Sequence, residues 1–177
     1  MPRLSCLRGP LHWDQILSMG VLLSRPELLA LRRRWRSEGL TVVFTNGCYD
    51  ILHPGHIRTL ERARALGDVL VLALNSDASV RRMKGPARPV VPERERAALA
   101  CALEAVDAVT LFDEDTPREL IAELLPDVLV KGSDWSHFVA GREEVEAAGG
   151  RVVLLPLEPG YSTTATVEQA LARRSSP

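Results

Sequence analysis

The sequence has few cysteines and no long apolar run. Its three cysteines form neither a Cys-x-x-Cys pair nor an even set, which is typical of reduced thiols rather than of a disulfide framework. No stretch of about 18 apolar residues could span a bilayer, and the first residues lack the unbroken apolar core of a signal peptide. These absences predict a soluble, cytoplasmic protein that does not enter a membrane.

The chain also lacks a surplus of either charge. Its 22 Lys and Arg against 23 Asp and Glu give a net charge of −1, whereas a general nucleic-acid binder usually carries a basic surplus. A length of 177 residues, 46% of them hydrophobic, fits one compact domain with an ordinary core. We expect residues 1–23 to form an N-terminal extension and residues 24–177 to form a single domain.

Apolar runs alternate with amphipathic helical segments along the chain. The strand-like runs cover 41–45, 68–74, 107–112, 126–132 and 151–157. The helical segments cover 24–39, 55–67, 91–106, 116–124, 141–150 and 162–174. Continuous apolar strands separated by helices indicate βαβ units. We therefore expect an α/β, Rossmann-like, doubly wound parallel sheet of about five strands with helices on both faces. Ligands bind beyond the carboxyl ends of such strands.

Two of the four histidines, His53 and His56, stand three residues apart in NGCYDILHPGH, directly after the first predicted strand. The second histidine opens a predicted helix, whose free N–H groups and positive dipole end favour an anion. Two imidazoles there can donate hydrogen bonds to phosphate oxygens. Cys48 and Asp50 lie nearby, but His-x-x-His on such a loop is not a zinc signature by itself. Phosphate handling is the preferred interpretation, with a zinc site and a structural coincidence as alternatives.

Two other loops at the same predicted edge carry polar residues. After the fifth strand, PGYSTTATVEQ places three hydroxyls before a helix, where they could cradle a phosphate or simply cap the helix. After the fourth strand, VKGSDW holds Lys131, which can reach into the crevice, and Asp134, which could orient a hydroxyl. A polar turn would explain the second loop equally well.

The segment NSDASVRRMKGPARPVVPERER follows the second strand and contains six cations, one glycine and three prolines. This composition predicts a long, mobile loop that closes over a phosphorylated substrate. Most charge runs are only solvated faces, so we assign Lys84, Arg88 and Arg96 alone to phosphate binding.

Together these loops describe a nucleotide pocket with no evident covalent nucleophile and no base in an activating pair. Such a pocket suits a reaction in which the attacking group is already an anion. A sugar phosphate that attacks the α-phosphate of a nucleoside triphosphate is such a case, with Mg²⁺ on the departing pyrophosphate.

The stretch NGCYDILHPGH resembles the Gly-x-(Phe/Tyr)-Asp-x-x-His-x-Gly-His signature of the cytidylyltransferase-like nucleotidyltransferases, and STT resembles their second motif. Within that group, residues from about 24 to 171, including ALNSDASVRRMKGPARPV and DVLVKGSDW, closely resemble the adenylyltransferase domain of ADP-heptose synthases. The resemblance implies transfer of AMP from ATP, with Mg²⁺, to D-glycero-β-D-manno-heptose 1-phosphate. The ADP-heptose would serve lipopolysaccharide or other heptose-containing glycans. It also implies a stand-alone form without a kinase domain, and a homodimer.

The same resemblance implies roles for individual residues. His53, His56 and Lys131 would be catalytic, and the two histidines would contact the ATP phosphates. The nucleotide would be bound by Asn46, Gly47, Cys48, Tyr49, Gly55, Asp134, Gly160, Ser162, Thr163 and Thr164. The sugar phosphate would be bound by Asp50, Lys84, Arg88 and Arg96. No residue is assigned to a metal held by the protein alone.

Two departures from the pattern keep an alternative open. Many relatives have Gly-Gly-Asp after the lysine, whereas GSDW, with Ser133 and Trp135, resembles the glycerol-3-phosphate cytidylyltransferases. Those enzymes tend to have an arginine where this chain has Leu157. The alternatives are therefore a CTP-dependent enzyme acting on glycerol 3-phosphate or a similar polyol or sugar phosphate, and a protein that binds nucleotide without turnover. A class I aminoacyl-tRNA synthetase fragment is rejected, because the chain is too short for the tRNA-binding parts.

Overall fold

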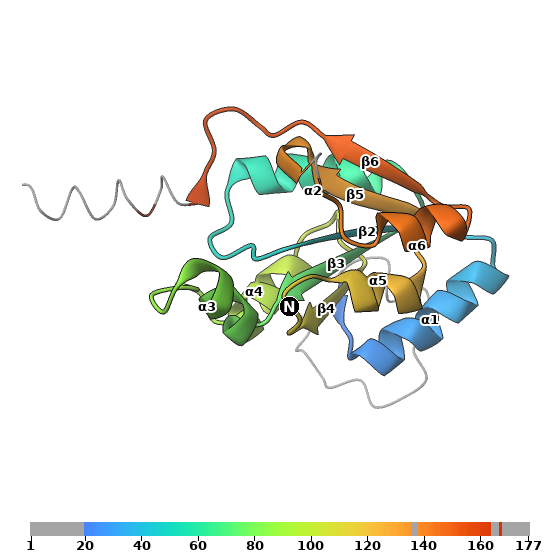
Figure 1. Ribbon diagram of the computed structural model, residues 1–177, viewed down its shortest axis with the longest axis horizontal. Coiled ribbons are helices and arrows are strands. Elements are labelled where there is room, and N and C mark those ends of the chain that lie inside the picture. The colour runs from blue at the N-terminus through green and yellow to red at the C-terminus, as the bar shows by residue number, and fades with distance from the viewer. Residues whose placement is uncertain (1–19, 136–137, 164–166, 168–177) are drawn as a thin grey trace, which may run out of the picture.

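Six parallel strands form one sheet in the computed structural model, which describes residues 20–135, 138–163 and 167 (Figure 1). The strands lie in the order β1-β4-β3-β2-β5-β6. Their bounds are Val21–Leu22 (β1), Val42–Gly47 (β2), Val69–Asn75 (β3), Ala108–Phe112 (β4), Val128–Gly132 (β5) and Arg151–Leu155 (β6). The predicted α/β, doubly wound parallel sheet is confirmed, with one strand more than expected.

Helices cover both faces of the sheet (Figure 1). Their bounds are Arg25–Ser37 (α1), Pro54–Arg64 (α2), Asp77–Lys84 (α3), Glu93–Cys101 (α4), Arg118–Leu124 (α5) and Arg142–Ala147 (α6), with a 3₁₀ turn at Ser133–Trp135 (η2). Helices α1, α5 and α6 share one core cluster, and α2 and α4 share the other. The predicted last helix, 162–174, lies mostly outside the described residues.

The central strands are mostly apolar because both of their faces are buried. Along β2, Val42 and Phe44 belong to the cluster under α1 and α5, whereas Val43 between them belongs to the cluster under α2 and α4. Successive side chains of a strand point to opposite faces, so a strand between two helical layers carries apolar residues on both of its sides.

The additional strand, β1, lies inside the stretch predicted to be an N-terminal extension. Val21 pairs with Ala108 and Leu22 with Val109 at the edge of β4. Leu23 follows as a buried core residue, and its N–H donates to the Val109 carbonyl at 2.8 Å. The sheet therefore begins before residue 24. A strand of two residues is too short to show the alternation that reveals strands in a sequence.

The segment predicted to be one long loop after β3 begins instead with helix α3. Ser76 caps this helix, because its hydroxyl oxygen accepts the Ser79 N–H at 3.0 Å. The irregular part is confined to residues 85–92, before α4 begins at Glu93. The helix was missed because its polar side chains give little apolar periodicity.

The strand order reverses between β2 and β5. The chain moves from β2 to β3 and β4 on one side, and from β5 to β6 on the other. In doubly wound sheets this reversal opens a crevice beyond the carboxyl ends of the two strands. Here those ends are Gly47 and Gly132, so the loops that follow them define the place to look for a site.

Candidate active site

The loop after β2 delivers both histidines to the start of α2. His53 caps the helix, and its Nδ1 accepts the His56 backbone N–H at 3.3 Å. An imidazole nitrogen that accepts carries no proton, so a neutral His53 has its proton on Nε2. The position of Pro54 in the first turn suits the helix, because that N–H would have no partner in any case. The local sequence thus fixes the orientation and the tautomer of His53.

The two imidazole rings are stacked, with centroids 3.7 Å apart and planes 12° apart. Tyr49 also contacts His56, with 4.7 Å between the ring centroids and a tilt of 44° between the planes. Gly55 permits this arrangement, because a Cβ there would lie 3.0 Å from the Tyr161 Cβ and 3.2 Å from the His53 ring. The surrounding residues of the fold therefore hold the two histidine rings in place.

Burial keeps both imidazoles uncharged. It lowers the pKa of His53, and it lowers the pKa of His56 to about 4, with the positive charges of His53 and Lys84 adding to the effect. At neutral pH both rings are therefore neutral hydrogen-bond donors. A neutral donor can hold a phosphate oxygen and gain strength as negative charge grows on it in a transition state.

A cavity of about 230 Å³, called here the histidine cavity, opens between the ends of β2 and β5. Its walls are Thr45, Asn46, Gly47, Cys48, Tyr49, Asp50, His56, Thr59, Lys84, Lys131, Gly132, Asp134, Leu157 and Thr163. Among the described residues, Asn46 Oδ1 and His56 Nδ1 are buried without a hydrogen-bond partner. Buried polar atoms are rarely left unpaired, so these two indicate that a polar ligand or water belongs here.

His53 itself lies on the other side of the stack. It lines a neighbouring depression with Leu52, Pro54 and Ile57, and its ring centroid is 5.8 Å from that of Tyr161. The structure thus brings His56 directly to the histidine cavity and places His53 behind it.

Lys131 stands at the end of β5 with its ammonium largely buried. Burial lowers the pKa of Lys131 to about 8, although the nearby Asp134 carboxylate opposes this shift. A cation that is partly stripped of water at the end of a strand is suited to hold an anion.

The loop after β6 comes back onto the histidine loop. Glu158 pairs with Arg58 at 3.0 Å and Arg62 at 2.6 Å on α2, and the Thr163 hydroxyl donates to the Ile51 carbonyl at 3.3 Å. Two motifs that are 110 residues apart therefore meet at one cavity, as the topology predicts. Gly160 and Ser162 are exposed and do not line the cavity, and Thr164 lies outside the described residues.

A second cavity of about 230 Å³, called here the adjacent cavity, shares five wall residues with the first, namely Asn46, Gly47, Cys48, Lys84 and Lys131. Its other walls are Asn75, Met83, Asp115, Thr116, Pro117, Phe138 and Ala140. Sequence reasoning missed these seven residues. Asn75 and Asp115 stand at or after the carboxyl ends of β3 and β4, so the strand-end rule could have identified them.

Asp50 and Arg88 are joined to each other beneath the loop of residues 85–92. Arg88 Nε donates to Asp50 Oδ2 at 2.6 Å, and Asp50 Oδ1 accepts the N–H groups of Val90 and Val91 at 2.8 and 2.9 Å. Burial raises the pKa of Asp50, but the Val91 N–H and the Arg88 guanidinium outweigh it and hold that pKa below its usual range. The pair fixes the loop beside the histidine cavity.

Arg96, the last of the predicted phosphate ligands, is fully buried. Its guanidinium donates to the Val91 carbonyl at 3.0 Å, the Cys48 carbonyl at 2.6 Å and the Asp77 carboxylate at 2.8 Å. The structure places Arg88 and Arg96 outside both cavities, and of the predicted sugar-phosphate residues only Asp50 and Lys84 line them. A sequence shows a cation but not the partners that already hold it.

The described residues contain neither a metal-binding cluster nor a membrane-spanning helix. No group of three or more His, Cys, Asp or Glu side chains is arranged to hold a metal ion in the part of the chain that the structure describes. None of the described helices is long and apolar enough to cross a membrane.

Comparison with known proteins gives consistent results. The family model described as cytidylyltransferase-like matches residues 44–169. The bifunctional protein HldE of Azorhizobium caulinodans is 53% identical over 157 residues, which are 88% of this chain and 33% of that protein. The HldE protein of Syntrophotalea carbinolica is 57% identical over 139 residues, 78% of this chain and 28% of that protein. This chain thus spans about a third of the length of these relatives.

Two solved structures have the same fold. The lipopolysaccharide core biosynthesis protein of Thermoplasma volcanium is 31% identical, with a TM-score of 0.56, and the match covers 68% of this chain and 98% of that one. The pantoate-beta-alanine ligase of Francisella tularensis, solved with an ATP analogue and beta-alanine, has a TM-score of 0.60 and covers 88% of this chain and 77% of that one. At 12% identity the second likeness shows the fold alone.

Proposed function

This chain belongs to the cytidylyltransferase-like family and is a nucleotidyltransferase, and we propose that it transfers AMP from ATP to D-glycero-D-manno-heptose 1-phosphate. The products are ADP-heptose and pyrophosphate. The observation that carries the proposal is the meeting of the HPGH and STT loops at one cavity, with the His56 ring and Lys131 on its wall.

The choice of ATP and a heptose phosphate rests on similarity. The sequence resembles the adenylyltransferase domain of ADP-heptose synthases over most of its length, and the HldE relatives are 53 to 57% identical to it. The relative from Thermoplasma volcanium is named for lipopolysaccharide core biosynthesis, a destination that suits an activated heptose.

In the reaction, a phosphate oxygen of the sugar phosphate forms a bond to the α-phosphorus of ATP. The bond from that phosphorus to the bridging oxygen breaks, and the pyrophosphate leaves with the electron pair. No base is needed, because a phosphate monoester is largely a dianion at neutral pH. The protein therefore has to align the reactants and stabilise negative charge.

The residues of the histidine cavity suit these two tasks. His56 donates to an oxygen of the triphosphate, and His53 keeps the ring and the helix start in place. Lys131 and Lys84 line both cavities, so they lie between the two reactants and can neutralise charge there. The adjacent cavity, with Asn75, Asp115 and Thr116, offers hydroxyl-binding groups for the sugar.

Mg²⁺ would enter with the triphosphate. The described residues offer no dedicated metal cage, which fits the habit of Mg²⁺ to bind through substrate phosphates and one or two carboxylates. Asp134 is the wall carboxylate suited to this contact, since Asp50 is committed to Arg88. The ion would neutralise charge on the departing pyrophosphate.

The test follows pyrophosphate release from heptose 1-phosphate with ATP or with CTP, and from glycerol 3-phosphate with each nucleotide. We expect release with ATP and heptose 1-phosphate, and a fall in kcat of about 10²-fold or more in His56→Ala, since a donor to the transition state is lost. Arg33→Gln, an exposed arginine of α1, is the control and should keep full activity.

Each other outcome rejects the proposal in a distinct way. Release only with CTP and glycerol 3-phosphate would make the protein a cytidylyltransferase, the reading that Ser133 and Trp135 suggest. ATP binding with no release from any pair would indicate a protein that binds nucleotide without turnover.

A further inference from the structure

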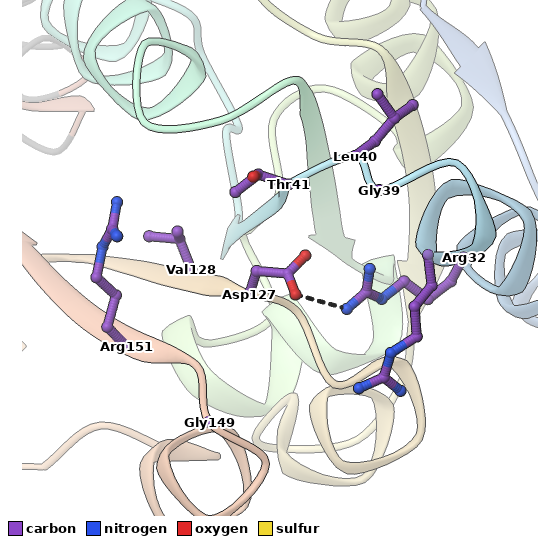
Figure 2. Close-up of a pocket in the computed structure, with 9 residues that line it drawn as sticks. Arg32, Gly39, Leu40, Thr41, Asp127, Val128, Gly149 and Arg151 are labelled. Carbon is purple, nitrogen blue, oxygen red and sulfur yellow. Dashed lines mark hydrogen bonds and ion pairs between the residues drawn. The ribbon is translucent and has the colours of Figure 1, made fainter.

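Figure 2 shows the residues that line a polar cavity of about 370 Å³. This cavity lies at the opposite end of the sheet from the histidine cavity. It is framed by the end of α1 and by the amino-terminal ends of β2, β5 and β6, where Thr41, Val128 and Arg151 stand. The same strands carry Gly47 and Gly132 at their other ends. This cavity is therefore a separate place on the molecule, which we call the arginine cavity.

The walls of the arginine cavity carry excess positive charge. Three arginines line it, Arg32, Arg36 and Arg151, against one carboxylate, Asp127. Both oxygens of Asp127 are committed, Oδ1 to Arg32 Nη2 at 3.0 Å and Oδ2 to the Val42 N–H at 2.7 Å. Three cations and one anion leave two positive charges that the walls do not balance.

Arg36 and Arg151 supply these two charges. Both are exposed, and neither has an ion pair or a side-chain hydrogen bond with another residue in the described ranges. Asp68 accepts the Thr41 N–H at 2.8 Å but does not line the cavity. Two guanidinium groups are thus available to an anion that enters the cavity.

Arg32 gives the second, independent indication of a ligand. Its side chain is only 6% exposed, and it holds the end of α5 through the Leu124 and Leu125 carbonyls at 3.2 and 2.7 Å. These hydrogen bonds use Nε and Nη2 of the guanidinium, whereas Nη1 is buried and has no partner among the described residues. Figure 2 shows the guanidinium extending toward Asp127, among the residues that frame the cavity. An unpaired buried donor is costly, and an anion in the cavity would add negative charge close to it.

We propose that the arginine cavity binds a small phosphorylated anion that lacks an aromatic base. Guanidinium groups match phosphate oxygens in geometry and bind them through two parallel hydrogen bonds. No aromatic side chain lines the cavity, so nothing there would stack on a nucleobase. The shared chemistry is a phosphoryl group with two or more negative charges, as in inorganic pyrophosphate or a sugar phosphate. This proposal does not depend on which substrates the histidine cavity takes.

The test is a titration of the ¹⁵N-labelled chain at 150 mM salt, with inorganic pyrophosphate in one arm and glucose 1-phosphate in the other. The reporters are the amide signals of Gly39 and Gly149, which line the arginine cavity but neither the histidine cavity nor the adjacent cavity. We expect saturable shifts of both signals, and at least a tenfold weaker apparent affinity in the Arg36→Gln, Arg151→Gln double variant. The arm with the tighter binding identifies the source of the phosphoryl group.

The control is the double variant Arg33→Gln, Arg94→Gln, which removes the same charge from two exposed arginines outside the cavity. It should bind within about twofold of the original chain. Equal affinities in the two double variants would show that net charge alone explains the binding, and this result would overturn the proposal. Unmoved Gly39 and Gly149 signals in both arms would overturn it without any substitution.

Discussion

Lys131 is the residue at which burial and charge oppose each other most clearly. An ammonium loses hydration when it is buried, and this lowers its pKa; for Lys131 the pKa falls to about 8, against the pull of Asp134. A bound phosphate would add negative charge at close range and favour the protonated ammonium. The state of Lys131 in the free protein therefore depends on pH within the range in which assays are performed.

This gives a prediction on pH dependence. The protonated fraction of Lys131 falls as pH rises through about 8, so kcat/KM, which reports the free enzyme, should fall on the alkaline side of that value. Lys131→Arg should lower kcat/KM overall but remove this alkaline fall, because a guanidinium stays charged. The measurement is kcat/KM for ATP from pH 6 to 10. An identical alkaline limb in the arginine variant would assign the titration to another group.

Individual site residues could be predicted to very different extents. His53 and His56 follow one predicted strand and Lys131 stands at the end of another, so their place followed from the topology alone. Arg88 and Arg96 carry the same kind of charge as Lys84, but their buried partners, Asp50 and the Cys48 carbonyl, come from distant parts of the chain. Nothing local in the sequence distinguishes a structural arginine from a ligand arginine.

At the scale of elements, the loop of residues 85–92 is held by one buried carboxylate. Asp50 is 1% exposed at its side chain and Arg88 is 12% exposed. Removing one partner of such a pair leaves the other charge buried and uncompensated, which costs about 3–5 kcal/mol. The loop is therefore anchored, whereas its composition of cations, glycine and prolines predicted a mobile flap.

We accordingly predict that Asp50→Asn lowers the free energy of unfolding by about 3 kcal/mol or more. The measurement is urea denaturation at neutral pH. The matched control is Glu146→Gln, which removes one charge from an exposed pair with Arg142 and should change stability by less than ~0.5 kcal/mol. Similar losses in the two variants would show that the Asp50–Arg88 pair does not anchor the loop.

The elements themselves were predicted where their apolar residues form a recognisable pattern. Buried strands such as Val69–Asn75, in which every residue before Asn75 is apolar, stand out in the sequence, and their alternation with helices indicated the parallel sheet. Helix α3, with eight mostly polar residues, and β1, with two, do not stand out in this way. Both form because of tertiary contacts, the first against β3 and the second against the edge of β4.

At the scale of the whole molecule, the reversal of strand order determines where the candidate active site lies. The histidine and adjacent cavities lie beyond the carboxyl ends of β2 to β5, and the arginine cavity lies at the amino-terminal ends. The residues that line the cavities at each end come from helices and loops far apart in the sequence. Both ends therefore depend on an intact sheet. Strand β1 belongs to that sheet although no sequence pattern indicated it.

The last prediction concerns this edge strand. A chain that starts at Gly20 retains the described residues, whereas a chain that starts at Ser24 loses β1 and the buried residue Leu23, which is 6% exposed. Burying a leucine contributes about 1.5–3 kcal/mol, so the shorter chain should be less stable than the longer one by about 2 kcal/mol or more in urea denaturation. It should also associate more readily, because the unpaired edge of β4 can then pair with another chain. Equal unfolding midpoints and equal monomer fractions in the two chains would place the start of the working domain at residue 24, the boundary that the sequence predicted.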